Sequence, residues 1–302
     1  MMTDRVEGPV FVIGTGRSGL TPLMDLIAYH DAFAWPSQYN ERRPQAPKLS
    51  LLSRVVDAPG FNSRLKFLRT VPKHDEAYRV WNNAFPGFAR PFRDLVEDDV
   101  TPYVRQRFHH IVDEIARYQS KNRFIAEYSG WSRIEFLKSI FPDAKFIHIV
   151  RDGRAVAHSY LNVPWWKGWE GVYAWQWGTP NGEIKEMLSR YHQSFLALAA
   201  VNWLLLVTNI REKAQSLPGG DFLSVRYEDL VEDPRREAFR CIAFCGLDPN
   251  PRFEKHVSTV RIVDANTNAL RIPPWRTNLS ERQVDMLNDL LRDALARFGY
   301  SE

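Results

Sequence analysis

The chain has 302 residues, of which 44% are hydrophobic and 25% are charged. This composition is that of a folded globular protein and excludes wholesale disorder, and the length suits one α/β domain or two small ones. The net charge of +4 at pH 7 fits an anionic ligand but is too small to indicate nucleic acid as a partner.

Candidate strands and helices alternate along the chain. Short apolar runs predict buried strands at 9–13, 124–128, 145–150 and in the first part of 222–230. Helical patterns follow at 20–30, 101–120, 131–141, in the second part of 151–162, and at 233–247 and 281–298. Residues 35–100 are weakly periodic and predict loops and short helices. The alternation predicts a parallel β-sheet with helices on both faces, and ligands of such sheets lie beyond the carboxyl ends of the strands.

Residues 191–210 carry no Asp, Glu, Lys or Arg, so they require a membrane test. A transmembrane helix needs roughly 20 predominantly apolar residues. The polar residues of this run, which shorten its apolar part, are His192, Gln193, Asn202, Thr208 and Asn209. We expect a buried helix here and no membrane span, with a transmembrane helix as the alternative.

The two cysteines, Cys241 and Cys245, lie within one predicted helix. A structural zinc site normally has four ligands and a redox pair has the spacing C-x-x-C, so we expect two small buried apolar side chains. No disulfide framework is indicated, and residues 1–14 lack the pattern of a signal peptide. The expected location is therefore cytoplasmic.

A glycine-rich loop with the sequence GTGRSGLT at 14–21 follows the first predicted strand. It has the spacing of the phosphate-binding pattern G-x-x-x-x-G-K-[ST], except that Leu20 stands at the lysine position. Backbone amides and a helix N-terminus bind anions without side chains, and Arg17 adds a positive charge. The candidate anion-binding residues are Gly14, Thr15, Gly16, Arg17, Ser18, Gly19, Leu20 and Thr21. The alternative is a simple glycine turn.

A second stretch, FIHIVRDGRAVAHS at 146–159, also follows a predicted strand. Arg151 stands at the strand's end and Ser159 on the following helix, so both side chains can reach a second anionic group. Asp152 can instead pair locally with Arg154, and the alternative for the whole stretch is a turn with surface charges. Because both stretches follow strands of a parallel sheet, we expect them on the same rim.

Together the two stretches resemble the sulfotransferases that use 3′-phosphoadenosine-5′-phosphosulfate (PAPS). Those enzymes have a loop of the type G-x-G-R-S-G-x-T, which holds the 5′-phosphosulfate, and a motif I-V-R-D-x-R-x-x-x-x-S, which holds the 3′-phosphate. The run RYEDL at 226–230 is similar to a third landmark of the family. The resemblance implies a single sulfotransferase-like domain over 1–302, with an acceptor-side region at about 35–120. It also implies in-line transfer of a sulfuryl group from PAPS to a hydroxyl or an amine, without a metal.

The resemblance leaves the general base open. In the bacterial and tyrosyl-protein branches a glutamate follows the first helix, but here Gln38 stands at that position. Glu41 is the expected replacement, with His74 and Glu127 as weaker candidates, so the predicted catalytic residues are Arg17, Glu41 and Ser159. A second departure is EYSG at 127–130, where relatives often carry Lys-Thr-Pro and thus a cation for the leaving phosphate.

Two aromatic stretches are candidates for ligand contact. The C-terminal segment at about 261–280 resembles the family's nucleotide-covering segment, so Arg271, Trp275 and Arg276 are expected over the phosphate or the adenine; the alternative is a Pro-rich connector. Tyr227 is a further candidate for the adenine. The run 164–178 holds five tryptophans, Trp165, Trp166, Trp169, Trp175 and Trp177. They suit a carbohydrate, aromatic or lipid-like acceptor, or they pack in the core.

Two other functions remain open from the sequence. A P-loop kinase or NTPase conflicts with Leu20 and lacks a convincing Walker-B strand. A catalytically silent nucleotide-binding protein on the same fold is consistent with Gln38 and with the missing Lys-Thr-Pro. The sequence names neither the acceptor nor the oligomeric state.

Overall fold

A five-stranded parallel β-sheet forms the centre of the protein in a computed structural model, which describes residues 6–58, 71–170, 182–260, 262 and 273–300. The strands are β1 (Val10–Gly14), β2 (Phe33–Ala34), β3 (Arg123–Ser129), β4 (Lys145–Val150) and β5 (Phe222–Arg226). Their order is β2-β3-β1-β4-β5, and every neighbouring pair is parallel. The predicted parallel sheet is confirmed, and the short strand β2 was not predicted.

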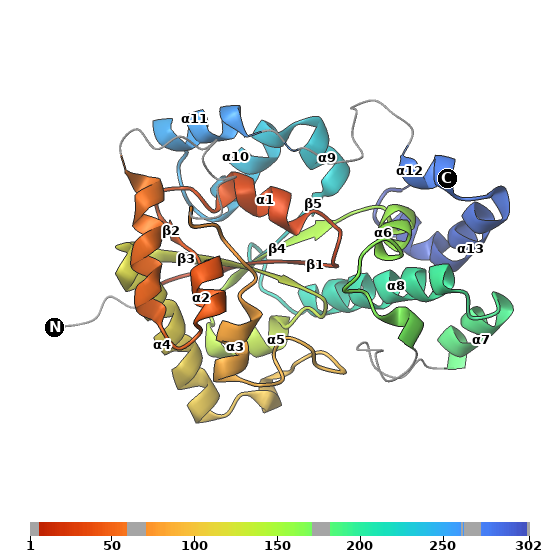
Figure 1. Ribbon diagram of the computed structural model, residues 1–302, viewed down its shortest axis with the longest axis horizontal. Coiled ribbons are helices and arrows are strands. Elements are labelled where there is room, and N and C mark those ends of the chain that lie inside the picture. Colours follow the sequence, from red (N-terminus) through yellow and green to blue (C-terminus); the bar gives the residue numbers. More distant parts are fainter. Residues whose placement is uncertain (1–5, 59–70, 171–181, 261, 263–272, 301–302) are drawn as a thin grey trace.

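Helices cover both faces of the sheet (Figure 1). The helices are α1 (Leu20–Ile27), α2 (Gln38–Arg42), α3 (Tyr78–Ala84), α4 (Pro102–Gln119), α5 (Ile134–Ile140), α6 (Gly153–Tyr160), α7 (Gly182–Arg190), α8 (Phe195–Ala214), α9 (Tyr227–Glu232), α10 (Pro234–Phe244), α11 (Pro251–Thr259), α12 (Pro274–Asn278) and α13 (Glu281–Arg297). The 3-10 helices are η1 (Pro47–Asp57), η3 (Glu97–Asp99) and η4 (Gly168–Glu170). The short helices α2, η1, α3 and η3 confirm the loops and short helices predicted for 35–100, except at 59–70, which lie outside the described residues.

Alternation along β1 divides the core into two layers. Phe11 and Ile13 pack with side chains of α3, α4 and α5 on one face, whereas Val10 and Val12 pack with those of α1, α10 and α11 on the other. Successive side chains of a strand point to opposite faces, so a strand buried on both faces is apolar throughout. This is why the run 9–13 was recognisable from sequence.

Helix α8 contains most of the uncharged run at 191–210. It begins after Ser194, whose hydroxyl accepts a hydrogen bond from the Ala197 amide at 3.2 Å, and it packs against α6 and α13. Ala200 and Trp203 are buried in a third apolar core. In the described part of the chain, α8 is the one helix long and apolar enough to cross a membrane, and just over half of its apolar window is buried. The predicted buried helix is confirmed.

The two cysteines lie at the end of α10. Both are free and buried, and burial raises the pKa of each thiol above its usual range. Each is therefore a neutral side chain of the apolar core between α10 and the sheet, as predicted.

Candidate active site

The loop at 14–19 joins β1 to α1 in a compact turn. The Thr15 carbonyl accepts hydrogen bonds from the Ser18 hydroxyl at 2.6 Å and from the Ser18 amide at 3.2 Å. Arg17 and Gly19 have φ values of 66° and 103°, in the left-handed region. Helix α1 has no side-chain cap, and its first backbone bond runs from Leu23 to Gly19. The amides just after Gly19 are therefore left for an anion.

Aromatic rings lie close against this loop. A Cβ atom on Gly19 would lie 2.3 Å from Cδ2 of Tyr227, and one on Gly16 would lie 2.7 Å from Cη2 of Trp165. The Thr15 side chain is buried within this turn. The backbone amides at the start of α1 and the Arg17 guanidinium form a donor set that fits the phosphate and sulfuryl oxygens of PAPS.

Leu20, at the lysine position of a Walker loop, points into the apolar core. It is 7% exposed and packs with the side chains around β1. The positive charge of the loop therefore comes from Arg17 alone. Thr21, in contrast, is exposed at the start of α1.

The two predicted phosphate motifs meet at the rim of the sheet. Gly14 at the end of β1 pairs in register with Ile149 of β4. Arg17 donates from Nε to the Ser159 hydroxyl at 2.9 Å, and Arg151 donates to the Arg17 carbonyl at 3.3 Å. The Arg151 guanidinium also lies 4.3 Å from the centre of the Tyr227 ring. The expectation that both motifs lie on one rim is confirmed.

Other charges of the second motif stabilise the fold locally. Asp152 accepts hydrogen bonds from the Arg154 side chain at 2.9 and 3.0 Å, so the expected local pair is present. Glu228 of the RYEDL run accepts from the Asp152 amide at 3.2 Å and from the Tyr300 hydroxyl at 2.7 Å. Burial raises the pKa of Glu228. This carboxylate thus connects the turn at 151–153 to the C-terminal residues.

Trp275 lies on α12, beside α6. Its ring is buried and lies 4.5 Å from the Arg154 guanidinium and 4.7 Å from that of Arg276. The predicted nucleotide-covering segment is described only from 273 onward, apart from residue 262, and Arg271 lies outside the described residues. The covering role of this segment stays a prediction.

A cluster of charged side chains lies between α1, β3 and the segment at 71–76; His74 and Glu127 are buried in it, and Asp25 is partly exposed. His74 contacts a Glu127 oxygen through Nδ1 at 2.8 Å and an Asp25 oxygen through Nε2 at 3.1 Å. Burial lowers the pKa of His74, but Glu127 and Asp25 outweigh this and raise it to about 10. Because a carboxylate only accepts hydrogen bonds, both ring nitrogens donate and His74 is an imidazolium at neutral pH. No metal-binding group of His, Cys, Asp and Glu occurs in the described parts of the chain.

Glu76 connects this cluster to the glycine-rich loop. Its Oε1 atom accepts from the Ser129 amide at 2.9 Å and from the Tyr78 hydroxyl at 3.3 Å. Ser129 lies opposite Gly14 in the β1–β3 register. Burial, and then the charge of Glu127, raise the pKa of Glu76 to about 7. Glu76 was not predicted as a site residue, although it belongs to the same run at 73–76 as His74.

Gln38 supports the segment that carries His74 and Glu76. Its side-chain amide donates to the Val71 carbonyl at 2.8 Å and accepts from the Lys73 amide at 2.6 Å. Only a group that both donates and accepts can make this pair of bonds, which an ionised glutamate cannot. The departure from the family pattern at position 38 therefore has a structural reason.

Glu41, the predicted base, accepts a hydrogen bond from the Arg79 amide at 2.8 Å. Burial raises the pKa of Glu41, and the Arg79 amide opposes this effect. Within the described ranges, none of its hydrogen bonds joins it to the loop at 14–19. The catalytic role of Glu41 stays a prediction.

The cation near the EYSG run is Arg133, and its guanidinium is occupied by hydrogen bonds to backbone carbonyls. The buried Arg133 guanidinium donates to the carbonyls of Phe88, Ala89, Ser129 and Trp131 at 2.7–3.2 Å. It therefore joins the end of β3 to the segment after α3. Arg133 does not replace the lysine that relatives often carry.

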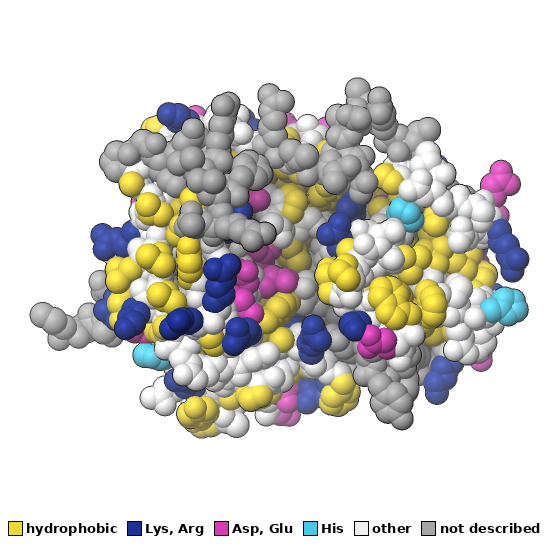
Figure 2. All heavy atoms as spheres, in the orientation of Figure 1, with side chains coloured by type: hydrophobic (Ala, Val, Ile, Leu, Met, Phe, Trp, Pro, Cys, Tyr) yellow, Lys and Arg dark blue, Asp and Glu magenta, His cyan; other side chains and the backbone are white. Residues whose placement is uncertain are grey.

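The tryptophan-rich run divides into packed and exposed rings. Trp166 is buried and stacks on Tyr160 with an interplanar angle of 7°. Trp165 and Trp169 are 50% and 40% exposed, and Trp165 is the ring beside Gly16. Trp175 and Trp177 lie outside the described residues. Hydrophobic side chains lie on both sides of a hollow where acidic side chains gather (Figure 2).

Residues 9–251 match the model of the sulfotransferase family. The chain belongs to the sulfotransferase family. This span contains both phosphate motifs, the charged cluster and RYEDL. The predicted family, fold class and PAPS-dependent transferase class are thereby confirmed, and membership disfavours the kinase and NTPase alternatives.

Among its relatives is the omega-hydroxy-beta-dihydromenaquinone-9 sulfotransferase Stf3 of Mycobacterium bovis, 23% identical over 97% of this chain and 76% of the relative. Carbohydrate sulfotransferase 2 of Mus musculus is 26% identical over 54% of this chain and 36% of its own. Among solved structures, the fold is similar to sulfotransferase STF9 from Mycobacterium avium, with a TM-score of 0.64 and 16% identity over 98% of this chain and 78% of that one.

Proposed function

We propose that this sulfotransferase binds PAPS across the two motifs at the sheet rim and transfers the sulfuryl group to the hydroxyl of a lipid-like acceptor. The observation that carries the proposal is the Arg17–Ser159 hydrogen bond, because it joins the two predicted phosphate sites. In this arrangement the loop at 14–21 receives the 5′-phosphosulfate, and Arg151 with Ser159 receives the 3′-phosphate. Tyr227, Trp275, Arg276 and Arg271 remain the candidates for the rest of the nucleotide.

The reaction is an in-line displacement at sulfur. The acceptor oxygen forms the new S–O bond, the bond from sulfur to the 5′-phosphate oxygen breaks, and the hydroxyl proton leaves to a base. The products are a sulfate ester and adenosine 3′,5′-bisphosphate. Arg17 and the loop amides stabilise the charge that develops on the leaving phosphate, as in phosphoryl transfer.

Glu76 is our candidate for the base, and Glu41 is the alternative. Glu76 is bonded to the residue opposite Gly14, which places it beside the loop that receives the sulfuryl group. A pKa of about 7 is suited to accepting a proton near neutral pH. Gln38 hydrogen-bonds to the backbone of the segment that precedes Glu76. The glutamine at the family's glutamate position therefore helps to hold the segment that carries Glu76.

The acceptor class is supported by the exposed rings at the loop. Trp165 presents flat apolar surface next to Gly16, and the exposed Trp169 packs against the neighbouring Trp166. Such surface suits a lipid-like or aromatic molecule better than a charged one. The Stf3 relative, which is aligned over 97% of this chain, is named for a menaquinone-derived lipid. A screen of hydroxylated isoprenoid quinones, steroid alcohols and sugars, each with PAPS, tests this class. Sulfation of sugars alone would contradict it.

The donor site is tested by calorimetric titration with adenosine 3′,5′-bisphosphate, beside ATP with Mg²⁺. We expect micromolar binding of the bisphosphate without metal and much weaker binding of ATP, which has no 3′-phosphate. The reverse preference would overturn the donor assignment. Bisphosphate binding without turnover on any acceptor would instead favour the catalytically silent alternative.

We also infer a cytoplasmic location. It is supported by the two cysteines, which are free and buried and so do not need an oxidising compartment. Cell fractionation with an antibody against the chain tests this inference.

A further inference from the structure

The segment from the end of α2 through η1 presents a basic and apolar surface. Residues 42–56 contain four Lys or Arg residues and no Asp or Glu. The members of this surface, here called the η1 surface, are Arg42, Arg43, Lys48, Leu51, Leu52, Arg54 and Val55, and all seven are exposed.

The 3-10 geometry of η1 sorts its side chains into rows. With three residues per turn, side chains three positions apart lie in line. Ser50, Ser53 and Val56 form the buried row, which faces the protein. The other two rows point outward, one with Lys48, Leu51 and Arg54 and the other with Leu52 and Val55. Aliphatic and basic side chains therefore alternate on one outward face.

The three aliphatic side chains of the η1 surface are about half exposed. Leu51, Leu52 and Val55 are 47%, 46% and 51% exposed. Single exposed aliphatic residues are normal on a protein surface, but a group of three surrounded by cations indicates an interaction surface. The unbroken positive charge of 42–56 makes its partner an anionic one.

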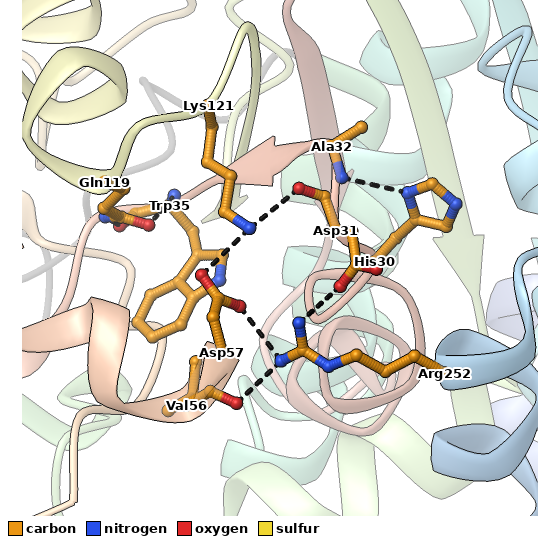
Figure 3. Close-up of polar contacts among 9 residues, drawn as sticks. All are labelled: His30, Asp31, Ala32, Trp35, Val56, Asp57, Gln119, Lys121 and Arg252. Carbon is orange, nitrogen blue, oxygen red and sulfur yellow. Dashed lines mark hydrogen bonds and ion pairs between the residues drawn. The ribbon is translucent and has the colours of Figure 1, made fainter. Parts of the chain in front are cut away.

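Ion pairs hold η1 firmly against the rest of the protein (Figure 3). Asp57, at the end of η1, pairs with Lys121 at 2.9 Å and with Arg252 at 3.0 Å. Arg252 also donates to the Val56 carbonyl at 2.6 Å and to Asp31 at 2.5 Å. The charge of Asp57, the acidic residue that follows η1, is thus neutralised by Lys121 and Arg252.

The η1 surface lies on the same face of the molecule as the candidate active site. In Figure 2, hydrophobic side chains among Lys and Arg side chains cover the region of α2 and η1, beside the hollow with the acidic side chains. Helix α2 connects the two regions directly, since it begins at Gln38 and ends at Arg42. A flat anionic layer against the η1 surface would therefore lie near the opening of the site.

We propose that the η1 surface docks the enzyme on an anionic lipid bilayer. Leu51, Leu52 and Val55 enter the boundary between headgroups and acyl chains, and the basic side chains contact lipid phosphates. This peripheral contact needs no membrane-spanning segment. It goes beyond the proposed function, because the surface binds lipid whether or not the acceptor is a lipid.

Vesicle sedimentation with the full chain tests the proposal. The probes are vesicles of phosphatidylcholine alone and vesicles of phosphatidylcholine mixed with phosphatidylglycerol. We expect binding to the anionic vesicles, weak binding to the neutral ones and loss of binding at high salt. Each basic residue contributes about fivefold to partitioning, so Lys48→Glu with Arg54→Glu should lower it by at least about 25-fold.

A second pair of substitutions and a matched control make the test specific. Leu51→Ser with Val55→Ser should also lower binding to the anionic vesicles, without a change of charge. Lys185→Glu with Arg282→Glu makes the same change of net charge at exposed positions on α7 and α13, and it should keep most of the binding. All variants should keep the parent's melting temperature, because the substituted side chains are exposed.

Three outcomes would overturn the proposal. The first is that the parent chain does not sediment with anionic vesicles. The second is that the η1 variants and the control variant lose vesicle binding equally. The third is that the η1 variants lose self-association, measured by light scattering, while their vesicle binding stays unchanged. The last outcome would assign the surface to a second copy of the chain. None of them bears on the titration with adenosine 3′,5′-bisphosphate, so the donor site is judged separately.

Discussion

Replacing Glu76 by glutamine separates a catalytic role from a structural one. Glutamine keeps the size of the side chain and its Oε1 atom, which accepts from the Ser129 amide, but it cannot take up a proton. Loss of a general base lowers the rate by about 10²–10⁴-fold. This corresponds to roughly 3–5 kcal/mol in the activation barrier. Affinity for adenosine 3′,5′-bisphosphate should not change.

The same substitution should not weaken the fold. The pKa of Glu76 rises from 4.5 to about 7 in the folded protein, mainly through burial. The folded state therefore favours the protonated form, and this contribution to stability is complete below pH 4.5 and is lost as pH rises through about 7. At pH 8 the substitution removes a penalty of at most roughly 3 kcal/mol. We expect Glu76→Gln to be as stable as the parent or more stable at pH 8.

The assay is the initial rate of acceptor sulfation across pH, with urea unfolding at pH 5 and pH 8. The rate of the parent should rise with pH through an apparent pKa of about 7. Glu41→Gln is the matched control, because Glu41 also accepts a backbone hydrogen bond and also has a raised pKa. If Glu76→Gln kept the parent's rate while Glu41→Gln lost it, Glu41 would be the base and our reasoning would be wrong.

Three further predictions concern Arg151, His74 and Gln38. Arg151→Ala should weaken bisphosphate binding more than tenfold in calorimetry, since a charged hydrogen bond contributes about 1.5–3 kcal/mol; unchanged affinity would remove Arg151 from the 3′-phosphate site. His74→Gln should lower the free energy of unfolding by about 3–5 kcal/mol at pH 7 in urea, because Glu127 loses its buried counter-ion. In the parent this contribution is complete below about pH 6.5, and it is lost progressively as pH rises from there through about 10. Gln38→Glu should cost about 1–3 kcal/mol at pH 8, because a carboxylate cannot donate to the Val71 carbonyl; an equally stable variant would contradict this assignment.

Much of the site was visible in the sequence because its parts are local. The loop at 14–21 and the stretch at 146–159 each combine a strand, a turn and a helix within a short run. Their geometry depends on glycines, on helix N-termini and on short apolar strands buried on both faces, all of which are short-range properties. Parallel strands bring their carboxyl ends to one edge, so the meeting of Arg17 with Ser159 was also predictable.

The acceptor side depended on contacts between residues far apart in the chain. From the sequence, Gln38 is interpreted as the loss of the general base. Only its hydrogen bonds to the segment at 71–73 show why an amide side chain stands at this position. No motif in the sequence marks Glu76; only the structure shows that Ser129 of β3 lies beside both Glu76 and Gly14. A pKa depends on burial and on neighbouring charges, and the η1 surface depends on which row of side chains faces the protein. Local sequence patterns encode neither the pKa nor the η1 surface. The sequence alone therefore predicted the candidate donor motifs, and the tertiary structure decided which carboxylate lies beside them.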